Sequence, residues 1–241
     1  MNTETLVTEA VFQTSALPQS EPPLDCSLCP RLAGFRQVCR AEFPSWWNAP
    51  VPSFGDPEAW LGIIGLAPGK HGANRTGRPF TGDFAGPLLF ETLDKFGLSE
   101  GKFAARIDDG VRLKGAIIIN AVKCLPPENK PTPEEIRTCR PFLETAVGML
   151  PRARVYIALG QIAHQSAVKA LGGRLPKCKF GHLNEHRMPS GTILIDSYHC
   201  SRYNQNTGRL TRDMFEAVFA RAVELGGEAV TPNQTSSTNR P

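Results

Sequence analysis

The 241-residue sequence has no apolar run that approaches the roughly 18 uninterrupted residues of a membrane-spanning helix, so we expect no membrane association. Its first residues include acids and no basic stretch, unlike a secretory signal, and this favours a cytoplasmic protein. A large charge excess of one sign is also missing, since 27 Lys and Arg stand against 23 Asp and Glu. The small positive excess excludes a polybasic tail but suits a globular protein with one cationic face.

Several sequence motifs are absent. The glycine-rich segment that follows the first apolar run has neither the G-x-x-x-x-G-K-[ST] pattern of a triphosphate-binding loop nor the G-x-G-x-x-G pattern of a dinucleotide site. A second C-x-x-C pair, which would indicate a zinc ribbon, is also lacking. The seven cysteines are an odd number, and in a reducing compartment they favour metal or cluster ligation over a disulfide framework.

What is present is an alternation of apolar runs and helical patterns. The runs cover residues 60–66, 116–122, 155–159 and 192–196, and the helical patterns cover 86–96, 133–150, 161–171 and 211–225. None of the runs alternates apolar with polar residues, which is typical of strands buried on both faces. We therefore predict an α/β fold, a three-layer α/β/α sandwich around a central four-stranded, mostly parallel sheet. A single domain is expected over residues 24–226, with disordered tails at 1–23 and 227–241.

Polar segments follow three of the predicted strands, where ligands of open parallel sheets bind. Residues 65–83 (GLAPGKHGANRTGRPFTGD) contain five glycines, which let a backbone approach a ligand closely. Asn120 interrupts an apolar run, which is costly unless its amide is hydrogen-bonded, and a structural role and a ligand-reading role are equally open. His199, in the segment 197–209, is either a packing residue or a neighbour of Asn120 where the strand ends converge.

Four of the cysteines form a possible ligand set. Cys26 and Cys29 are a C-x-x-C pair before the first strand, and Cys124 and Cys139 follow the second run. Two local and two distant thiols suit either a four-thiolate zinc site or an iron–sulphur cluster, and the spacing does not decide between them. The other three cysteines, at 39, 178 and 200, are expected to be small hydrophobes or surface thiols.

Together, the strings GLAPGKHGANRTGRPFTGD, NAVKC, ALG and HCSRYNQNTGRLT resemble the iron–sulphur uracil-DNA glycosylases, and most closely family 5, or type b, over roughly residues 24–222. The resemblance implies a [4Fe–4S] cluster on Cys26, Cys29, Cys124 and Cys139. It also implies a monomer of the bacterial cytosol or nucleoid that hydrolyses the N-glycosidic bond of uracil, or of other deaminated bases, in single- or double-stranded DNA. One departure is Cys200, which stands where the family has Pro, and we expect it to loosen a DNA-penetrating loop.

The resemblance also suggests roles for individual residues. Phe80 would stack on an everted base, and Asn120 would read its edge, because an amide matches N3–H and O4 of uracil but mismatches cytosine. His199, neutral or protonated, and backbone N–H groups of Ala67 and Gly69 would stabilise negative charge on the leaving base. Asp83 would position the attacking water or counter charge on the sugar, or would instead cap the following helix.

A further set of residues is expected to contact DNA: Asn74, Arg75, Arg78, Ser201, Arg202, Tyr203 and Arg209. The arginines would hold phosphates, and Arg202 and Tyr203 would also fill the gap left by the base. A single Arg is more typical of a solvated surface, so only the clustering on two loops supports this prediction. Three rival interpretations are a non-catalytic module that binds uracil-containing DNA, a small-nucleotide hydrolase and a structural zinc protein.

Overall fold

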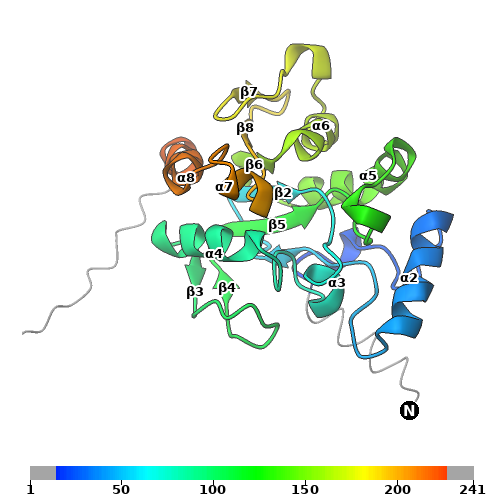
Figure 1. Ribbon diagram of the computed structural model, residues 1–241. Coiled ribbons are helices and arrows are strands. Elements are labelled where there is room, and N and C mark those ends of the chain that lie inside the picture. Colours follow the sequence, from blue (N-terminus) through cyan, green and yellow to red (C-terminus); the bar gives the residue numbers. More distant parts are fainter. Residues whose placement is uncertain (1–14, 227–241) are drawn as a thin grey trace, which may run out of the picture.

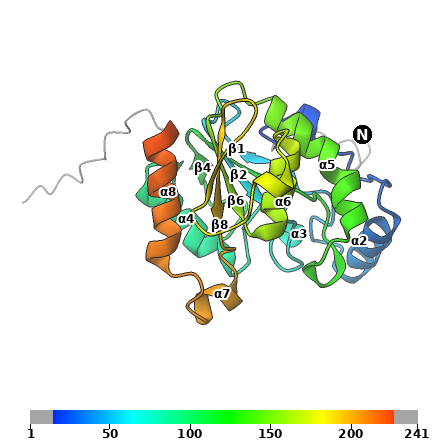
Figure 2. The same ribbon diagram turned by 90° about the horizontal axis from the view of Figure 1, so that it is seen from above.

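A six-stranded sheet separates two helical layers in the computed structural model, which describes residues 15–226 (Figures 1 and 2). The strand order is β1-β5-β2-β6-β8-β7. The four central strands are parallel: β5 (Ala116–Asn120), β2 (Leu61–Gly65), β6 (Val155–Leu159) and β8 (Ile193–Ser197). They coincide with the four apolar runs of the sequence, and the prediction of an α/β sandwich with a mostly parallel sheet is confirmed.

The sheet has six strands rather than four because a short antiparallel strand is added at each edge. β1 (Phe54–Gly55) pairs with β5, and β7 (Glu185–Arg187) pairs with β8. A separate pair is formed by β3 (Ser99–Glu100) and β4 (Arg112–Leu113). Strands of two or three residues are too short to show any periodicity, so no sequence pattern indicated them.

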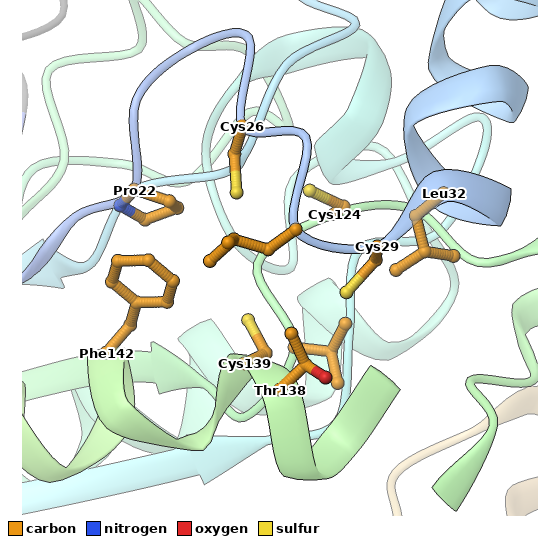
Figure 3. A pocket seen from close by; sticks show the side chains of 10 residues that line it. Pro22, Cys26, Cys29, Leu32, Cys124, Thr138, Cys139 and Phe142 are labelled. Atoms are coloured by element: carbon orange, nitrogen blue, oxygen red, sulfur yellow. The ribbon is translucent and has the colours of Figure 1, made fainter. Parts of the chain in front are cut away.

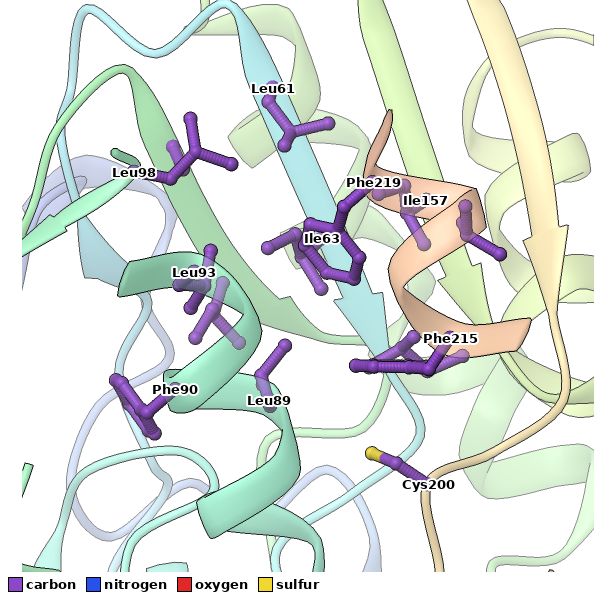
Figure 4. Packing of buried hydrophobic residues seen from close by; sticks show 14 of the residues in the cluster. Leu61, Ile63, Leu89, Phe90, Leu93, Leu98, Ile157, Cys200, Phe215 and Phe219 are labelled. Atoms are coloured by element: carbon purple, nitrogen blue, oxygen red, sulfur yellow. The ribbon is translucent and has the colours of Figure 1, made fainter. Parts of the chain in front are cut away.

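Helices cover both faces of the sheet. Helices α4 (Ala85–Lys95) and α8 (Arg212–Gly226) lie on one side, and α5 (Pro133–Gly148) and α6 (Gln161–Ala170) on the other (Figure 2). Successive residues of a strand point to opposite faces. Ile63 therefore belongs to the core beneath α4 and α8 (Figure 4), and the adjacent Ile64 belongs to the core beneath α5 and α6. Burial on both faces explains why the strand sequences do not alternate.

The remaining elements are short or lie outside these layers. They are η1 (Pro18–Ser20), α2 (Pro30–Glu42), α3 (Ala73–Thr76), η2 (Pro127–Asn129), η3 (Leu175–Lys177) and α7 (Arg202–Asn206). The predicted start of α5 is confirmed by a capping box, in which Thr132 and Glu135 each accept a backbone hydrogen bond from the other. Among the described helices none is both long and apolar enough to cross a bilayer.

The predicted N-terminal tail extends too far into the chain. Leu17 and Ser20 are buried, and the Ala16 N–H donates to the carbonyl of Ser53. Glu21 forms a 2.9 Å ion pair with Lys123, which is completely buried. Residues 15–23 are thus part of the folded body. The rest of the two expected tails, residues 1–14 and 227–241, lies outside the described residues, and the single-domain organisation stays a prediction.

The carboxyl ends of the four parallel strands lie at the same edge of the sheet. The register places Gly65, the last residue of β2, beside Asn120, the last residue of β5. It also places Leu159 beside Ser197, at the ends of β6 and β8. The segments that leave these four residues therefore begin side by side, although they are far apart in the sequence.

Candidate functional site

Asn120 presents an unpaired amide at this edge. Its side chain is buried, with 4% of the residue exposed, and within residues 15–226 the amide has no hydrogen-bond partner. A Cβ atom at Gly65 would lie only 2.5 Å from Asn120 Oδ1 and 3.2 Å from the ring of Phe80. A glycine at position 65 is therefore needed for Phe80 and Asn120 to come together. An amide with no partner inside the protein keeps both its donor and its acceptor available to a ligand.

Phe80 is held beside this amide in an unusual backbone conformation. Its φ is +55°, in the left-handed region, and the residue is 7% exposed. Its carbonyl is so close to Gly86 that a Cβ there would lie 2.1 Å from the oxygen. The ring faces His199, with 6.3 Å between the ring centroids and 29° between the planes. A bulky residue in this region costs about 1–3 kcal/mol, and such strain is typical of functional sites.

His199 completes the group. Its imidazole is half-buried and makes no hydrogen bond within the described residues, although its carbonyl accepts one from Asn204 Nδ2 at 2.8 Å. Burial lowers the pKa of the imidazole, so the neutral form predominates near pH 7. Gly160, with φ +96°, approaches it so closely that a Cβ atom there would lie 3.3 Å from His199 Cβ. The structure thus brings Phe80, Asn120 and His199 together, as the sequence predicted.

Asp83 uses its two oxygens differently. Oδ1 accepts hydrogen bonds from the N–H groups of Ala85 and Gly86, at 3.1 and 3.2 Å, and so caps the first turn of α4. Oδ2 faces the glycine-rich loop, since Cβ atoms at Gly69 and Gly72 would lie 3.8 and 2.8 Å from it. Burial raises the pKa of the carboxyl, although the two N–H donors act in the opposite direction. The capping role is thus observed, and it leaves one oxygen directed toward the loop.

The loop contains the other two residues expected to contact the base. Ala67 and Gly69 are both half-buried. The carbonyl of Gly69 accepts a 3.1 Å hydrogen bond from the N–H of Asn74, which fixes the loop from behind. Whether the N–H groups of Ala67 and Gly69 reach a base stays a prediction.

Two residues expected to contact DNA are instead buried in the protein. Asn74 is 2% exposed, and its Nδ2 donates to Asn48 Oδ1 at 2.9 Å. Arg78 is 4% exposed and donates two hydrogen bonds of 2.7 Å to the carboxylate of Asp109. Its guanidinium also lies 5.2 to 5.8 Å from the centroids of three phenylalanine rings. The prediction that these two residues bind phosphates was wrong, because both groups are already paired inside the fold.

Four other side chains of that set are exposed: Arg75, Arg202, Tyr203 and Arg209. None of the three guanidinium groups forms an ion pair in the part of the chain that the structure describes. Arg202 lies over the ring of Phe84 at 4.9 Å, and Arg209 lies over Tyr198 at 4.8 Å. Ser201 accepts a hydrogen bond from the Asn204 N–H and caps α7. Phe84, which lies under Arg202, was not among the expected site residues; it is an exposed aromatic residue, and its one signal in the sequence was its place directly after Asp83.

Cys200 does not loosen its loop. The residue is fully buried in the core beneath α4 and α8 (Figure 4). Its carbonyl accepts a 2.7 Å hydrogen bond from Gln205 Nε2, next to the bond between Asn204 and His199. Burial raises the pKa of the thiol, so Cys200 is a neutral apolar side chain, as predicted. The expected loosening is therefore wrong, because core packing and two side-chain amides hold the segment.

The four cysteines proposed as ligands line one pocket (Figure 3): Cys26, Cys29, Cys124 and Cys139. They come from the start of α2, the end of β5 and the middle of α5, and all are free thiols. Apolar side chains of Leu32, Val122 and Phe142 close the pocket. Burial, with a contribution from neighbouring thiols, raises the pKa of Cys29 to about 11 and of Cys124 to about 12. Thiolates would persist here only if a positive group bound them.

No three of these four sulfurs lie within 4.8 Å of one another. Within residues 15–226, the group of three potential ligand atoms that does meet this distance lies elsewhere, and His164, His186 and Asp196 form it. Zn–S bonds of about 2.3 Å would bring the sulfurs of a tetrahedral zinc site to about 3.8 Å from one another. Arg36 Nη1 lies 3.8 Å from the sulfur of Cys124, and the Lys123 N–H donates to that of Cys139 at 3.4 Å. Such donors stabilise negative charge on cluster sulfurs.

Comparison with known proteins adds to this geometry. Residues 52–222 match the family model described as the Uracil DNA glycosylase superfamily. The chain is 47% identical over 209 residues to a type-5 uracil-DNA glycosylase of Thermus thermophilus, covering 84% of this chain and 94% of that protein. It is 39% identical over 208 residues to a type-5 uracil-DNA glycosylase of Pyrobaculum aerophilum, covering 85% and 90%. A type-4 uracil-DNA glycosylase of that organism is 36% identical, over 53% of this chain.

Proposed function

We propose that this chain, which belongs to the uracil-DNA glycosylase superfamily and within it to the type-5 enzymes, excises uracil from DNA. The reaction is hydrolysis of the bond between the base and the deoxyribose, which leaves an abasic site. The observation that carries this proposal is the buried, unpaired amide of Asn120 between Phe80 and His199. The similarity to enzymes over most of the chain favours catalysis over a module that only binds DNA.

Recognition of the base is assigned to Asn120 and Phe80. A base inside a duplex cannot be reached, so it must rotate out of the stack into the space beside Phe80 and Asn120. Stacking on the Phe80 ring then offsets part of the lost stacking energy. The Asn120 carbonyl accepts from N3–H of uracil, and its NH2 donates to O4, whereas cytosine presents an acceptor and a donor in the reverse order. The fixed position of both side chains makes this mismatch costly.

Bond cleavage leaves negative charge on the uracil and positive charge on the sugar. His199 is neutral because its pKa is lowered, so it carries no positive charge before the reaction. It donates one hydrogen bond to O2 of the leaving base. The backbone N–H groups of Ala67 and Gly69 act on the same oxygen. Asp83 keeps Oδ1 on the cap of α4 and uses Oδ2 to orient water or oppose the charge on the sugar. The capping and catalytic roles of Asp83 are therefore compatible.

Binding of the DNA backbone is assigned to the exposed cations of the rim. Arg75, Arg202 and Arg209 have no ion-pair partner in the described residues, so their charge is available to phosphates. Phosphate contacts position the DNA without reading its sequence. Ser201 and Tyr203 belong to the same segment as Arg202. The Tyr203 ring is 70% exposed, and together with Arg202 it would fill the place of the everted base.

We also propose that the four-cysteine pocket holds a [4Fe–4S] cluster. Four free thiols that share one pocket and are spaced more widely than the ligands of a single zinc ion support this assignment. Bound there, the group would crosslink the segment before α2 to β5 and α5, which is a structural role. Iron and acid-labile sulphide contents near four per chain, with both lost in Cys29→Ala, would be expected. One zinc and no sulphide per chain would contradict the assignment.

The function is tested by base release from oligonucleotides that carry uracil, hypoxanthine or thymine opposite each normal base. We expect alkali-cleavable abasic sites from uracil, and the other bases define the breadth of specificity. Asp83→Asn and His199→Ala should bind the same DNA and release far less base. Asn206→Ala, on the exposed part of α7, is a matched control that should keep full activity. Binding without release by the unaltered protein would support the non-catalytic alternative, and turnover of free deoxyuridine monophosphate would support a nucleotide hydrolase.

A further inference from the structure

Leu183 combines two features that packing does not explain. Its φ is +63°, in the left-handed region that non-glycine residues rarely adopt. Its side chain is also 40% exposed, so it is not held in this conformation by burial in a core. Glycine or asparagine would occupy such a position without strain. An apolar side chain that is both strained and exposed indicates a role outside the folded chain.

The turn that carries Leu183 is tightly fixed. The Leu183 N–H donates to the carbonyl of Asp196 at 2.8 Å, and the Asp196 N–H donates to the carbonyl of Asn184 at 2.9 Å. The Asn184 Nδ2 donates to the carbonyl of Lys179 at 3.0 Å, and this hydrogen bond closes the turn. Gly181 leaves no room for a side chain, because a Cβ atom would lie 2.6 Å from that Nδ2. The turn therefore cannot move Leu183 aside without breaking several hydrogen bonds.

Beneath this turn lies a buried polar cluster that the proposed reaction does not use. The carboxylate of Asp196, which is 0% exposed, faces His164 Nδ1 at 2.6 Å and accepts from His186 Nε2 at 2.9 Å. It also accepts from the Gly181 N–H at 3.2 Å. His164 Nε2 donates to the carbonyl of Cys178 at 2.9 Å. A separation of 2.6 Å is that of a hydrogen bond rather than of two ligands on one ion, so the cluster anchors residues 178–184 from below.

The anchored turn lies beside the end of β8, the strand that leads to His199. It pairs with β8 at Asp196, and the Tyr198 N–H donates to His182 Nδ1 at 3.2 Å, so the turn runs beside the end of this strand. His199 follows Asp196 by three residues, about 10 Å of extended chain. The segment before β7 lies above α7 in Figure 1. Leu183 and Tyr203 of α7 are both exposed, and they come from different segments.

We infer that Leu183 is a wedge that enters the base stack of duplex DNA beside the everted uracil, a role that rests on the proposed function. Apolar side chains inserted at a base step unstack it and hold it open. A wedge must resist the stack that it separates, and the fixed turn with its buried anchor supplies that resistance. Together with Tyr203 on α7, Leu183 would keep the vacated position open. Single-stranded DNA has no opposing strand to restore the stack, so it does not need the wedge.

The test compares excision of uracil from duplex and single-stranded oligonucleotides under single-turnover conditions, with the full chain. Leu183→Asn keeps a residue that tolerates the left-handed conformation but removes the apolar side chain. We expect a rate about tenfold lower on duplex DNA, an unchanged rate on single-stranded DNA and an unchanged thermal midpoint. Leu183→Met, which keeps an apolar side chain of similar reach, should restore the duplex rate. Val38→Ala, which shortens another exposed apolar side chain, on α2, is the control and should alter neither rate.

Two results would overturn the inference while leaving the proposed function intact. One is a duplex rate in Leu183→Asn equal to that of the unaltered protein. The other is an equal loss on both substrates, which would indicate a general effect on the pocket or on folding. Failure of the unaltered protein to release uracil from single-stranded and duplex DNA alike would instead overturn the proposed function, and the inference with it.

Discussion

The two polar loops at the carboxyl edge of the sheet look alike in sequence, but they differ in how far their polar side chains are paired inside the protein. In the loop of residues 66–84, Asn74 and Arg78 turn inward and are paired with Asn48 and Asp109. In the segment 198–209 the arginines are exposed and have no ion pair within the described residues. The difference shows that a polar side chain beside a ligand site has a structural role, rather than a ligand-binding role, where a distant part of the chain supplies its partner.

The largest expected effect falls on the inward-turned loop. Arg78→Met should lower the free energy of unfolding by about 3–5 kcal/mol, because it leaves the Asp109 carboxylate buried and unpaired. Urea denaturation measures this loss. Arg202→Met, in the other segment, is the matched control and should leave stability unchanged. The contrast between the loops would fail if Arg78→Met kept full stability and lost affinity for DNA.

The next effect concerns chemistry in the second segment. His199→Ala should lower the single-turnover rate of uracil release by about 10²–10³-fold, the usual cost of removing one preorganised donor to a developing oxyanion. Affinity for uracil-containing DNA should change little, because in the proposed reaction the imidazole acts on charge that appears only during cleavage. A large loss of binding with an unchanged rate constant would place His199 in DNA binding instead.

A smaller effect is expected on the pH profile, and it tests the first loop. The raised pKa of Asp83 means that its protonated form persists above the ordinary value of 3.8. In the proposed reaction the carboxylate is the active form, so the rate should fall on acidification at a higher pH than an ordinary aspartate would give. Single-turnover rates across the acid range measure this limb. Asp83→Asn should release uracil slowly at every pH, and its rate should not fall on acidification. If its rate fell at the same pH as that of the unaltered protein, the fall would belong to another titrating group.

The smallest effect is expected from the exposed arginines. Arg202→Gln and Arg209→Gln should each reduce the slope of log affinity against log salt concentration by about 0.9, the value of one phosphate contact on duplex DNA. Fluorescence anisotropy with a labelled duplex at several salt concentrations measures the slope. The weakening should be the same for uracil-containing and ordinary DNA, since phosphates carry no sequence information. Unchanged slopes would remove both residues from the interface.

Much of the fold and part of the site could be predicted from local patterns. The central strands and α5 followed from apolar runs and helical patterns, and the parallel order of the strands then brought Phe80, Asn120 and His199 to one edge. The pairing of Arg78 with Asp109, 31 residues away, could not be predicted, because a single sequence does not show which distant groups meet. The same limit hid the cluster around Asp196, whose members come from α6, β7 and β8.

The central claim is that one everted uracil occupies the space bounded by Phe80, Asn120 and His199. A crystal structure of Asp83→Asn bound to a uracil-containing oligonucleotide tests it most directly. We expect the uracil ring against Phe80, with N3–H and O4 on the Asn120 amide and O2 near His199. A uracil that binds elsewhere on the protein, or that stays stacked in the DNA while the complex is otherwise formed, would contradict the account.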